Sequence, residues 1–194
     1  GYLPEERGLS PGMTARDAIA FMGALRDLPR KEGRARADAR LAALGLGHAA
    51  GTKIRKLSKG MAQMVQLVGA LIHDPELIVL DEPFSGLDPV NQERLEAQIL
   101  AQRDRGATVI LSTHVMAHAQ RLCDGLAIIA GGQCRFTGTV EGRGRCWRCR
   151  SATGHGPAWI RLRYGSNCRQ TRANMRANGV LRCLMMVSSR CWRG

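Results

Sequence analysis

Acidic residues are absent from one end of this 194-residue sequence. Residues 142–194 hold 12 Arg but no Asp, Glu or Lys, whereas residues 1–141 hold 17 Lys and Arg against 16 acidic residues. The net charge of +13 therefore belongs to the C-terminal end, and the rest of the chain has a net charge of only +1. A near-neutral body gives no electrostatic reason to expect a nucleic-acid partner for it.

Long apolar runs and a secretory leader are lacking too. No stretch of about 18 apolar residues occurs, so the sequence contains no candidate for a helix that spans a bilayer by itself. The first residues, Gly-Tyr-Leu-Pro-Glu-Glu-Arg, have no basic start, no apolar core and no initiating Met. We therefore expect an N-terminally truncated chain without a membrane span of its own.

The most informative stretch runs from Leu77 to Asp88. Its first four residues are apolar and follow the turn signal Asp74-Pro75, so they predict a short strand buried in a parallel sheet. Asp81 and Glu82 stand at the end of this strand, where ligands bind in open α/β sheets. Because side chains alternate along a strand, one carboxylate suits a bound cation and the other suits a proton acceptor aimed at water.

Residues 58–73 form the clearest predicted helix. Ser58 is a good N-cap, and Gly60 lets a ligand approach the backbone. Free N–H groups and the helix dipole make such an N-terminus a site for a phosphate. For Ser58 alone a helix cap is the simpler interpretation, whereas the whole segment favours phosphate binding. The apolar face predicted to lie in the core consists of Met61, Met64, Val65, Val68, Leu71 and Ile72.

A second predicted buried strand covers residues 107–111 and ends at Ser112-Thr113-His114. If this strand neighbours the first, His114 lies beside the two carboxylates and can donate an N–H to a phosphate. His118 follows at a spacing that suits a metal pair, but no third ligand is near it in sequence. We therefore interpret His118 as an ordinary helix residue.

In their order and spacing these segments resemble those of the ATP-binding cassette (ABC) ATPases, in an exporter-like form. The resemblance covers about residues 1–141. Residues 77–82 resemble the Walker B strand, and residues 85–88 resemble the D-loop. Residues 57–61 resemble the signature, residues 112–114 the switch-histidine loop and residues 1–9 the Q-loop region. Lys59 and Met61 replace the signature's first Gly and its Gln, and Glu5 stands where the family usually has Gln.

The resemblance implies a role for each segment around bound ATP. Asp81 would hold Mg²⁺, Glu82 would act as the general base, and His114 would orient the attacking water and sense the γ-phosphate. The Q-loop-like residue would be Glu5. The signature residues that would contact ATP held by a second copy are Leu57, Ser58, Lys59, Gly60 and Met61. The D-loop residues are Ser85, Gly86, Leu87 and Asp88, of which Asp88 would link the two sites.

The implied fold is α/β: a partial P-loop NTPase (ABC ATPase) domain with a mostly parallel sheet and a helical subdomain. Residues 1–141 would be the C-terminal part of an ABC nucleotide-binding domain, with the helical subdomain and signature helix at 14–75. Within this subdomain Thr14 and Asp17 predict a capped helix start, and Pro29 and Gly33 are expected to break the helix.

Residues 142–194 are expected to be an irregular tail, disordered or unselected, such as a translated frame-shift. They contain five of the seven Cys and all three Trp. Cys146-x-x-Cys149 is half of a zinc-site pattern, but no second pair follows at a suitable spacing. The charge alone would also allow a nucleic-acid tail, although the aromatic spacing offers no stacking platform.

The resemblance implies the ATP-hydrolysing subunit of an ABC transporter, peripheral on the cytoplasmic face of the cell membrane. Its partners would be a second nucleotide-binding domain and transmembrane permease subunits, and its cofactors ATP and Mg²⁺. A Walker A loop, Gly-x4-Gly-Lys-Ser/Thr, is not found among the 194 residues, so this fragment is expected to be inactive alone. The alternatives are a soluble ABC-type ATPase that acts on DNA or the ribosome, and a non-catalytic remnant.

Overall fold

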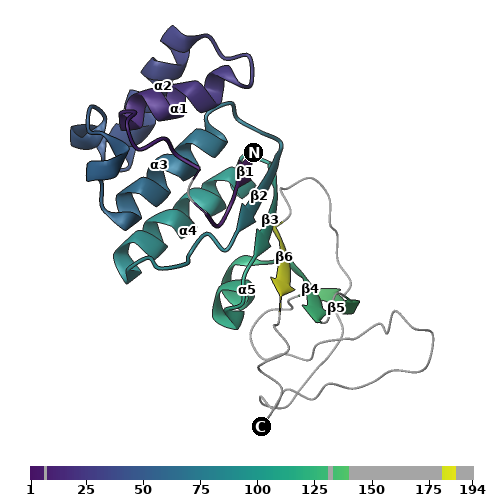
Figure 1. The fold of residues 1–194 in the computed structure, drawn as a ribbon. Coiled ribbons are helices and arrows are strands. Elements are labelled where there is room, and N and C mark those ends of the chain that lie inside the picture. The colour runs from purple at the N-terminus through teal and green to yellow at the C-terminus, as the bar shows by residue number, and fades with distance from the viewer. Residues whose placement is uncertain (7, 131–132, 140–180, 187–194) are drawn as a thin grey trace, which may run out of the picture. The chain divides into compact units, whose positions relative to one another are not determined.

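The computed structural model describes residues 1–6, 8–130, 133–139 and 181–186 (Figure 1). The chain divides into two compact units, residues 1–101 and 102–194, with the division inside helix α4 (Pro89–Asp104). Helices and parallel strand pairs occur together, which confirms the predicted α/β class. Within the described part of the chain, no helix combines the length and the apolar character that a membrane span requires.

The strands of the first unit are β1 (Tyr2–Leu3) and β2 (Leu77–Asp81), which pair in parallel. The predicted strand is thus confirmed and extends to Asp81. Ile78 and Leu80 are buried, whereas Leu77 is 51% exposed at the start of the strand. The core face of β2 therefore ends next to the two carboxylates.

Helices α1 (Ala15–Ala24) and α2 (Arg30–Ala43) begin and end largely as the sequence predicts. Thr14 Oγ1 accepts a hydrogen bond from the Asp17 N–H at 3.2 Å and donates one to the Asp17 carboxylate at 2.8 Å. The expected break at Gly33 is wrong, because Gly33 lies inside α2. A Cβ there would be 3.3 Å from the Ala20 Cα of α1, so the glycine allows the two helices to cross closely.

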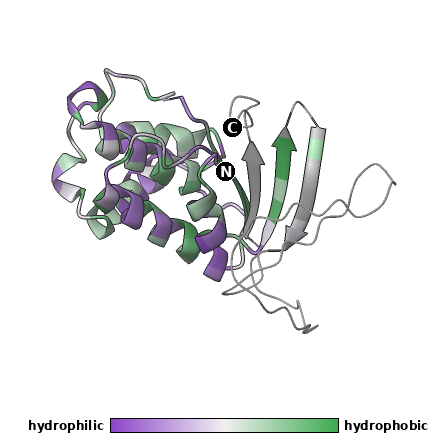
Figure 2. Cartoon of the chain, turned by 90° about the horizontal axis from the view of Figure 1, so that it is seen from below, coloured by the Kyte–Doolittle hydropathy of each residue, from purple (hydrophilic) through white to green (hydrophobic). Residues whose placement is uncertain are grey.

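Helix α3 (Lys59–Leu71) follows two short 3₁₀ turns, η1 (Gly47–Ala49) and η2 (Ile54–Lys56). Its predicted N-cap is confirmed, since Ser58 Oγ accepts from the Met61 N–H at 3.2 Å. Helix α3 contacts α1, α2 and β1, and every residue from Ala62 to Leu71 is buried. Helix α3 is therefore central to the first unit and is buried on more than one face. Other helices carry both hydrophilic and hydrophobic residues along their length (Figure 2).

The second unit holds the strands β3 (Thr108–Ser112), β4 (Gly125–Ala130), β5 (Gln133–Thr139) and β6 (Leu181–Met186), with α5 (Met116–Leu122) after β3. Strand β6 pairs in parallel with both β3 and β4. Strands β4 and β5 form an antiparallel hairpin. The structure thus differs from the predicted irregular tail at six residues, 181–186, and the rest of residues 142–194, including Cys146 and Cys149, lies outside the described residues.

Candidate functional site

Two carboxylates end strand β2, as the sequence predicts. Asp81 is the last residue of the strand, and Glu82 follows with a φ of 41°, both half-buried. The left-handed region costs a residue with a Cβ about 1–2 kcal/mol, and such strain clusters at active sites and ligand clamps. The Ser85 N–H donates to the Glu82 carbonyl at 3.0 Å and closes a turn. Glu82 therefore leaves the strand direction immediately after Asp81.

The loop 85–88 ends by capping helix α4. Asp88 Oδ1 accepts from the Asn91 N–H at 3.0 Å, and Asp88 Oδ2 accepts from Asn91 Nδ2 at 2.6 Å. These hydrogen bonds, that of the Asn91 backbone foremost, lower the pKa of Asp88 from its ordinary value. Gly86 has a φ of 65°, a conformation that glycine adopts easily. The loop is thus fixed at its last residue by the helix that follows.

The segment 57–61 forms the N-terminus of α3. Ser58 and Lys59 are exposed, so a second molecule can reach them. The Ser58 hydroxyl accepts the hydrogen bond from Met61 and keeps its own O–H as a donor for a ligand oxygen. An exposed helix N-terminus with a hydroxyl donor has the chemistry that an anionic group requires.

Contacts within the first unit join this segment to the loop after β2. The Lys59 side chain lies across Gly86, and the Asn91 side chain lies against Gly60. In the interior, Gln63 Nε2 donates to the Pro83 carbonyl at 3.4 Å. The two segments predicted to face a nucleotide are therefore held together inside one copy of the chain. The sequence alone does not identify Asn91 and Gln63, since their only signal is a distance of three residues from Asp88 and Gly60, respectively.

The Glu5–Glu6 segment is tied to the same helix. Gln66, only 2% exposed, donates from Nε2 to the Glu6 carbonyl at 3.3 Å, whereas the Glu5 side chain is exposed. The backbone of the segment is thus anchored on α3 while Glu5 stays accessible. Its predicted contact with a metal remains a prediction.

His114 belongs to the second unit and follows β3, where its side chain is exposed. The neighbouring Thr113 is buried, and its Oγ1 accepts from the Val115 N–H at 3.1 Å. This short turn sets the exit of the chain from the strand. Because Asp81 and Glu82 lie in the first unit, the expected proximity of His114 to them remains a prediction. His118 is buried in α5.

The chemistry of the donor set at the end of β2 suits Mg²⁺. Carboxylate and hydroxyl oxygens are hard ligands, and Asp81, Glu82 and Ser85 supply them within five residues. Mg²⁺ usually takes one or two protein carboxylates, with water and substrate phosphates as its other ligands. In the described residues no group of at least three His, Cys, Asp or Glu side chains forms a complete metal site.

Comparison with known proteins identifies the family of this chain. The ABC transporter family model matches residues 1–85, which include the 57–61 segment, β2 and the two carboxylates. The chain is 36% identical over 155 residues to YhaQ, an ABC transporter ATP-binding protein of Bacillus subtilis, covering 80% of this chain and 52% of YhaQ. The chain belongs to the family of ABC transporter ATP-binding proteins.

A second relative and a solved structure support the same family. It is 34% identical over 139 residues to the linearmycin resistance ATP-binding protein LnrL of Bacillus subtilis, covering 72% of this chain and 45% of LnrL. A solved ATP-binding subunit of an ABC transporter matches with a TM-score of 0.65 and 32% identity, over 72% of this chain and 58% of that one. The ABC chain spans about half the length of the curated relatives it matches.

Proposed function

We propose that the complete protein containing this chain hydrolyses Mg-ATP to drive an ABC transporter. The observation that carries the proposal is the strained Glu82, with φ 41°, directly after Asp81 at the end of β2. A glutamate held in this conformation by the surrounding turn is pre-positioned for a fixed task. The similarity to ABC transporter ATP-binding proteins supports the activation of water for ATP hydrolysis as that task.

The proposed roles are those that the resemblance to the ABC family implies for each segment. Asp81 provides the oxygen ligand for Mg²⁺, which neutralises charge on the phosphates when bound. Glu82 accepts the proton of the attacking water, and His114 donates an N–H to the γ-phosphate. Ser58 and the N-terminus of α3 bind ATP held by a second copy of the chain, a role that the exposure of Ser58 and Lys59 supports.

The proposed partners are a second nucleotide-binding domain and transmembrane permease subunits, with the protein peripheral on the cytoplasmic face of the membrane. The near-neutral charge of residues 1–141 supports a protein partner over nucleic acid. The resistance role in the name of LnrL favours an exporter-like system. Co-purification tests this: the proposal expects a permease, and DNA or ribosomes in its place would favour the soluble ABC-type ATPase.

Replacement of the base tests the central claim. Glu82→Gln keeps the shape of the side chain but cannot accept a proton, so steady-state ATP hydrolysis by the complete protein should fall roughly 10³-fold. Binding of ATP, followed with a fluorescent analogue, should change little. Glu76→Gln, at an exposed position just before β2, is the matched control and should leave turnover unchanged. Turnover retained by Glu82→Gln would contradict the assignment.

Residues 1–194 alone should show no Mg-ATPase activity. They contain no Gly-x4-Gly-Lys-Ser/Thr segment to hold the β- and γ-phosphates, so the water-activating groups have no positioned substrate. The measurement is phosphate release by the purified chain at saturating Mg-ATP. Activity that Glu82→Gln abolishes would show that other residues of this chain hold the phosphates.

A further inference from the structure

Asn91 lies between the two segments that the proposed function assigns to nucleotide. It is the third residue of α4, and both its backbone N–H and its Nδ2 donate to the Asp88 carboxylate, at 3.0 and 2.6 Å. The two bonds fix the direction of a side chain that has few rotamers. The amide is therefore held in place from the loop side.

On the other side the amide meets Gly60. A Cβ built on Gly60 would be 2.6 Å from Asn91 Nδ2, 3.1 Å from Cγ and 3.6 Å from Cβ. Contacts shorter than about 3 Å cannot be tolerated without a shift of one partner. Because the amide is hydrogen-bonded to Asp88, a shift of the Asn91 side chain away from such a Cβ would disturb that bond. Gly60 is thus small because Asn91 fills the space beside it.

We infer that Asn91 is a positioning residue that sets the distance between the 57–61 segment and the 85–88 loop within one copy of the chain. The inference rests on the proposed function, in which both segments face ATP. The contact of Lys59 with Gly86 and the bond from Gln63 to Pro83 connect the same two segments. The Asn91 link differs from these because it is both hydrogen-bonded and sterically closed.

Loss of the link should affect the rate more than the affinity. Asn91→Ala leaves Ser58, Asp81 and Glu82 in the chain but lets the two segments move relative to each other. Misplacement by 1 Å can lower a rate about 100-fold, so we expect kcat for ATP hydrolysis to fall at least about 10-fold and KM to change less than about 3-fold. Glu93→Ala, an exposed truncation in the same helix, should change neither.

A double-mutant cycle separates this steric role from a need of the nucleotide for glycine. Gly60→Ala should lower kcat about as much as Asn91→Ala, because the new methyl group displaces the amide. In the Asn91→Ala background only the Cβ of residue 91 remains, at an ordinary contact distance of 3.6 Å, so Gly60→Ala should add less than about a 3-fold loss. Multiplicative losses in the double variant, or a wild-type kcat in Asn91→Ala, would overturn the inference.

A measurement independent of activity covers variants that fold poorly or turn over too slowly. ¹³C NMR titration of labelled Asp in the complete protein should show the pKa of Asp88 rising toward its ordinary value in both Asn91→Ala and Gly60→Ala. A pKa of Asp88 that Gly60→Ala leaves unchanged would show that Gly60 does not act on Asn91. Failure of the proposed function can be told apart from failure of this inference, because it would appear as unimpaired ATP turnover in the Glu82→Gln variant.

Discussion

At the scale of single residues, backbone conformation distinguishes Glu82 from the other described residues with positive φ. The residues with positive φ other than glycine are Asp27, Asp74 and Glu82 among those described. Aspartate tolerates this region because its short side chain bonds locally, so the first two are ordinary turn residues. The longer side chain of glutamate does not favour positive φ in this way. The strain at Glu82 therefore singles it out without reference to any motif.

The Glu82→Gly variant should be more stable than the Glu82→Ala variant. Both substitutions remove the carboxylate equally, so their difference reports the backbone alone. Because φ is 41°, Glu82→Gly should have a free energy of unfolding about 1 kcal/mol above that of Glu82→Ala in urea titrations of the complete protein. At Glu93, inside α4, the order should reverse, with Gly about 1 kcal/mol below Ala. Equal stabilities at position 82 would mean that its backbone is unstrained.

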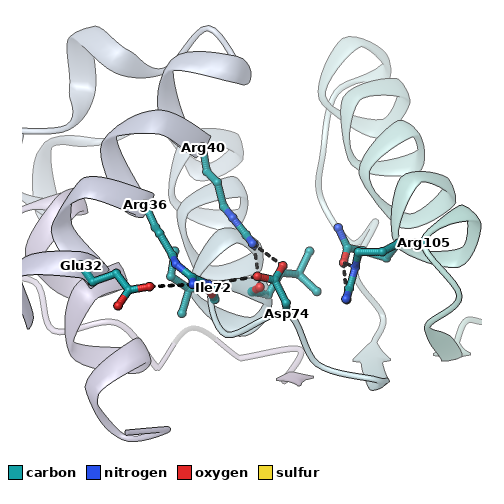
Figure 3. Close-up of polar contacts among 8 residues, drawn as sticks. Glu32, Arg36, Arg40, Ile72, Asp74 and Arg105 are labelled. Carbon is teal, nitrogen blue, oxygen red and sulfur yellow. Dashed lines mark hydrogen bonds and ion pairs between the residues drawn. The ribbon is translucent and has the colours of Figure 1, made fainter. Parts of the chain in front are cut away.

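At the scale of elements, a cluster of charges joins α2 to the end of α3 (Figure 3). Arg36 and Arg40 pair with the Asp74 carboxylate at 3.0 and 2.6 Å, and Arg36 also pairs with Glu32 at 2.6 Å. Arg40 Nη1 also donates to the Leu71 carbonyl at 2.6 Å, which satisfies an acceptor at the helix end. Since β2 begins three residues after Asp74, the cluster sets where the strand starts relative to α2.

Removal of the Asp74 charge should weaken this connection measurably. Asp74→Asn keeps a residue that tolerates φ 53° but loses both ion pairs, so the free energy of unfolding should fall by about 1 kcal/mol. The side chains are 28–43% exposed, so the loss should shrink in 1 M salt. Asp104→Asn, which removes an exposed pair with the adjacent Arg103, is the control and should change little. A loss that salt does not reduce would argue against the ion pairs as its cause.

Helix ends could be predicted from the sequence because their chemistry is local. Thr14 with Asp17, and Ser58, cap the helices where expected. Predictions that depend on a neighbouring element did worse. Gly33 was expected to break a helix, but it serves the contact of α2 with α1. In α1, Ile19 is fully buried whereas the equally apolar Phe21 is 49% exposed, because the helices around α1 decide which of its faces packs.

The Asn91 link was missed for the same reason. Its distance of three residues from Asp88 is visible in the sequence, but Gly60 lies 31 residues away and only the fold brings it near. The candidate segments themselves, Asp81 with Glu82 and the 57–61 segment, can be proposed from the sequence because each is contiguous. Local patterns thus predict candidate groups, and the three-dimensional structure shows which residues contact them.

At the scale of the whole chain, strand β6 shows how far local patterns fall short. The biased composition of residues 142–194 predicts an irregular tail. Residues 181–186 are Leu-Arg-Cys-Leu-Met-Met, a largely apolar stretch of strand length interrupted by Arg182, and they pair on both sides, with β3 and with β4. A strand between two parallel neighbours is selected by those neighbours, which lie more than 50 residues earlier in the sequence.

A proline in β6 tests whether this strand belongs to the sheet of the second unit. Leu184 pairs with Ser112 of β3 and with Ala127 of β4, so it has a strand on each side. Proline has no N–H and is excluded from central strands, so Leu184→Pro should lower hydrogen-exchange protection of the β3 and β4 amides at least about 10-fold. Leu184→Val favours strand conformation and should preserve that protection. If Leu184→Pro leaves β3 and β4 as protected as before, the pairing of β6 is unnecessary for them, and the irregular tail predicted from composition regains its support.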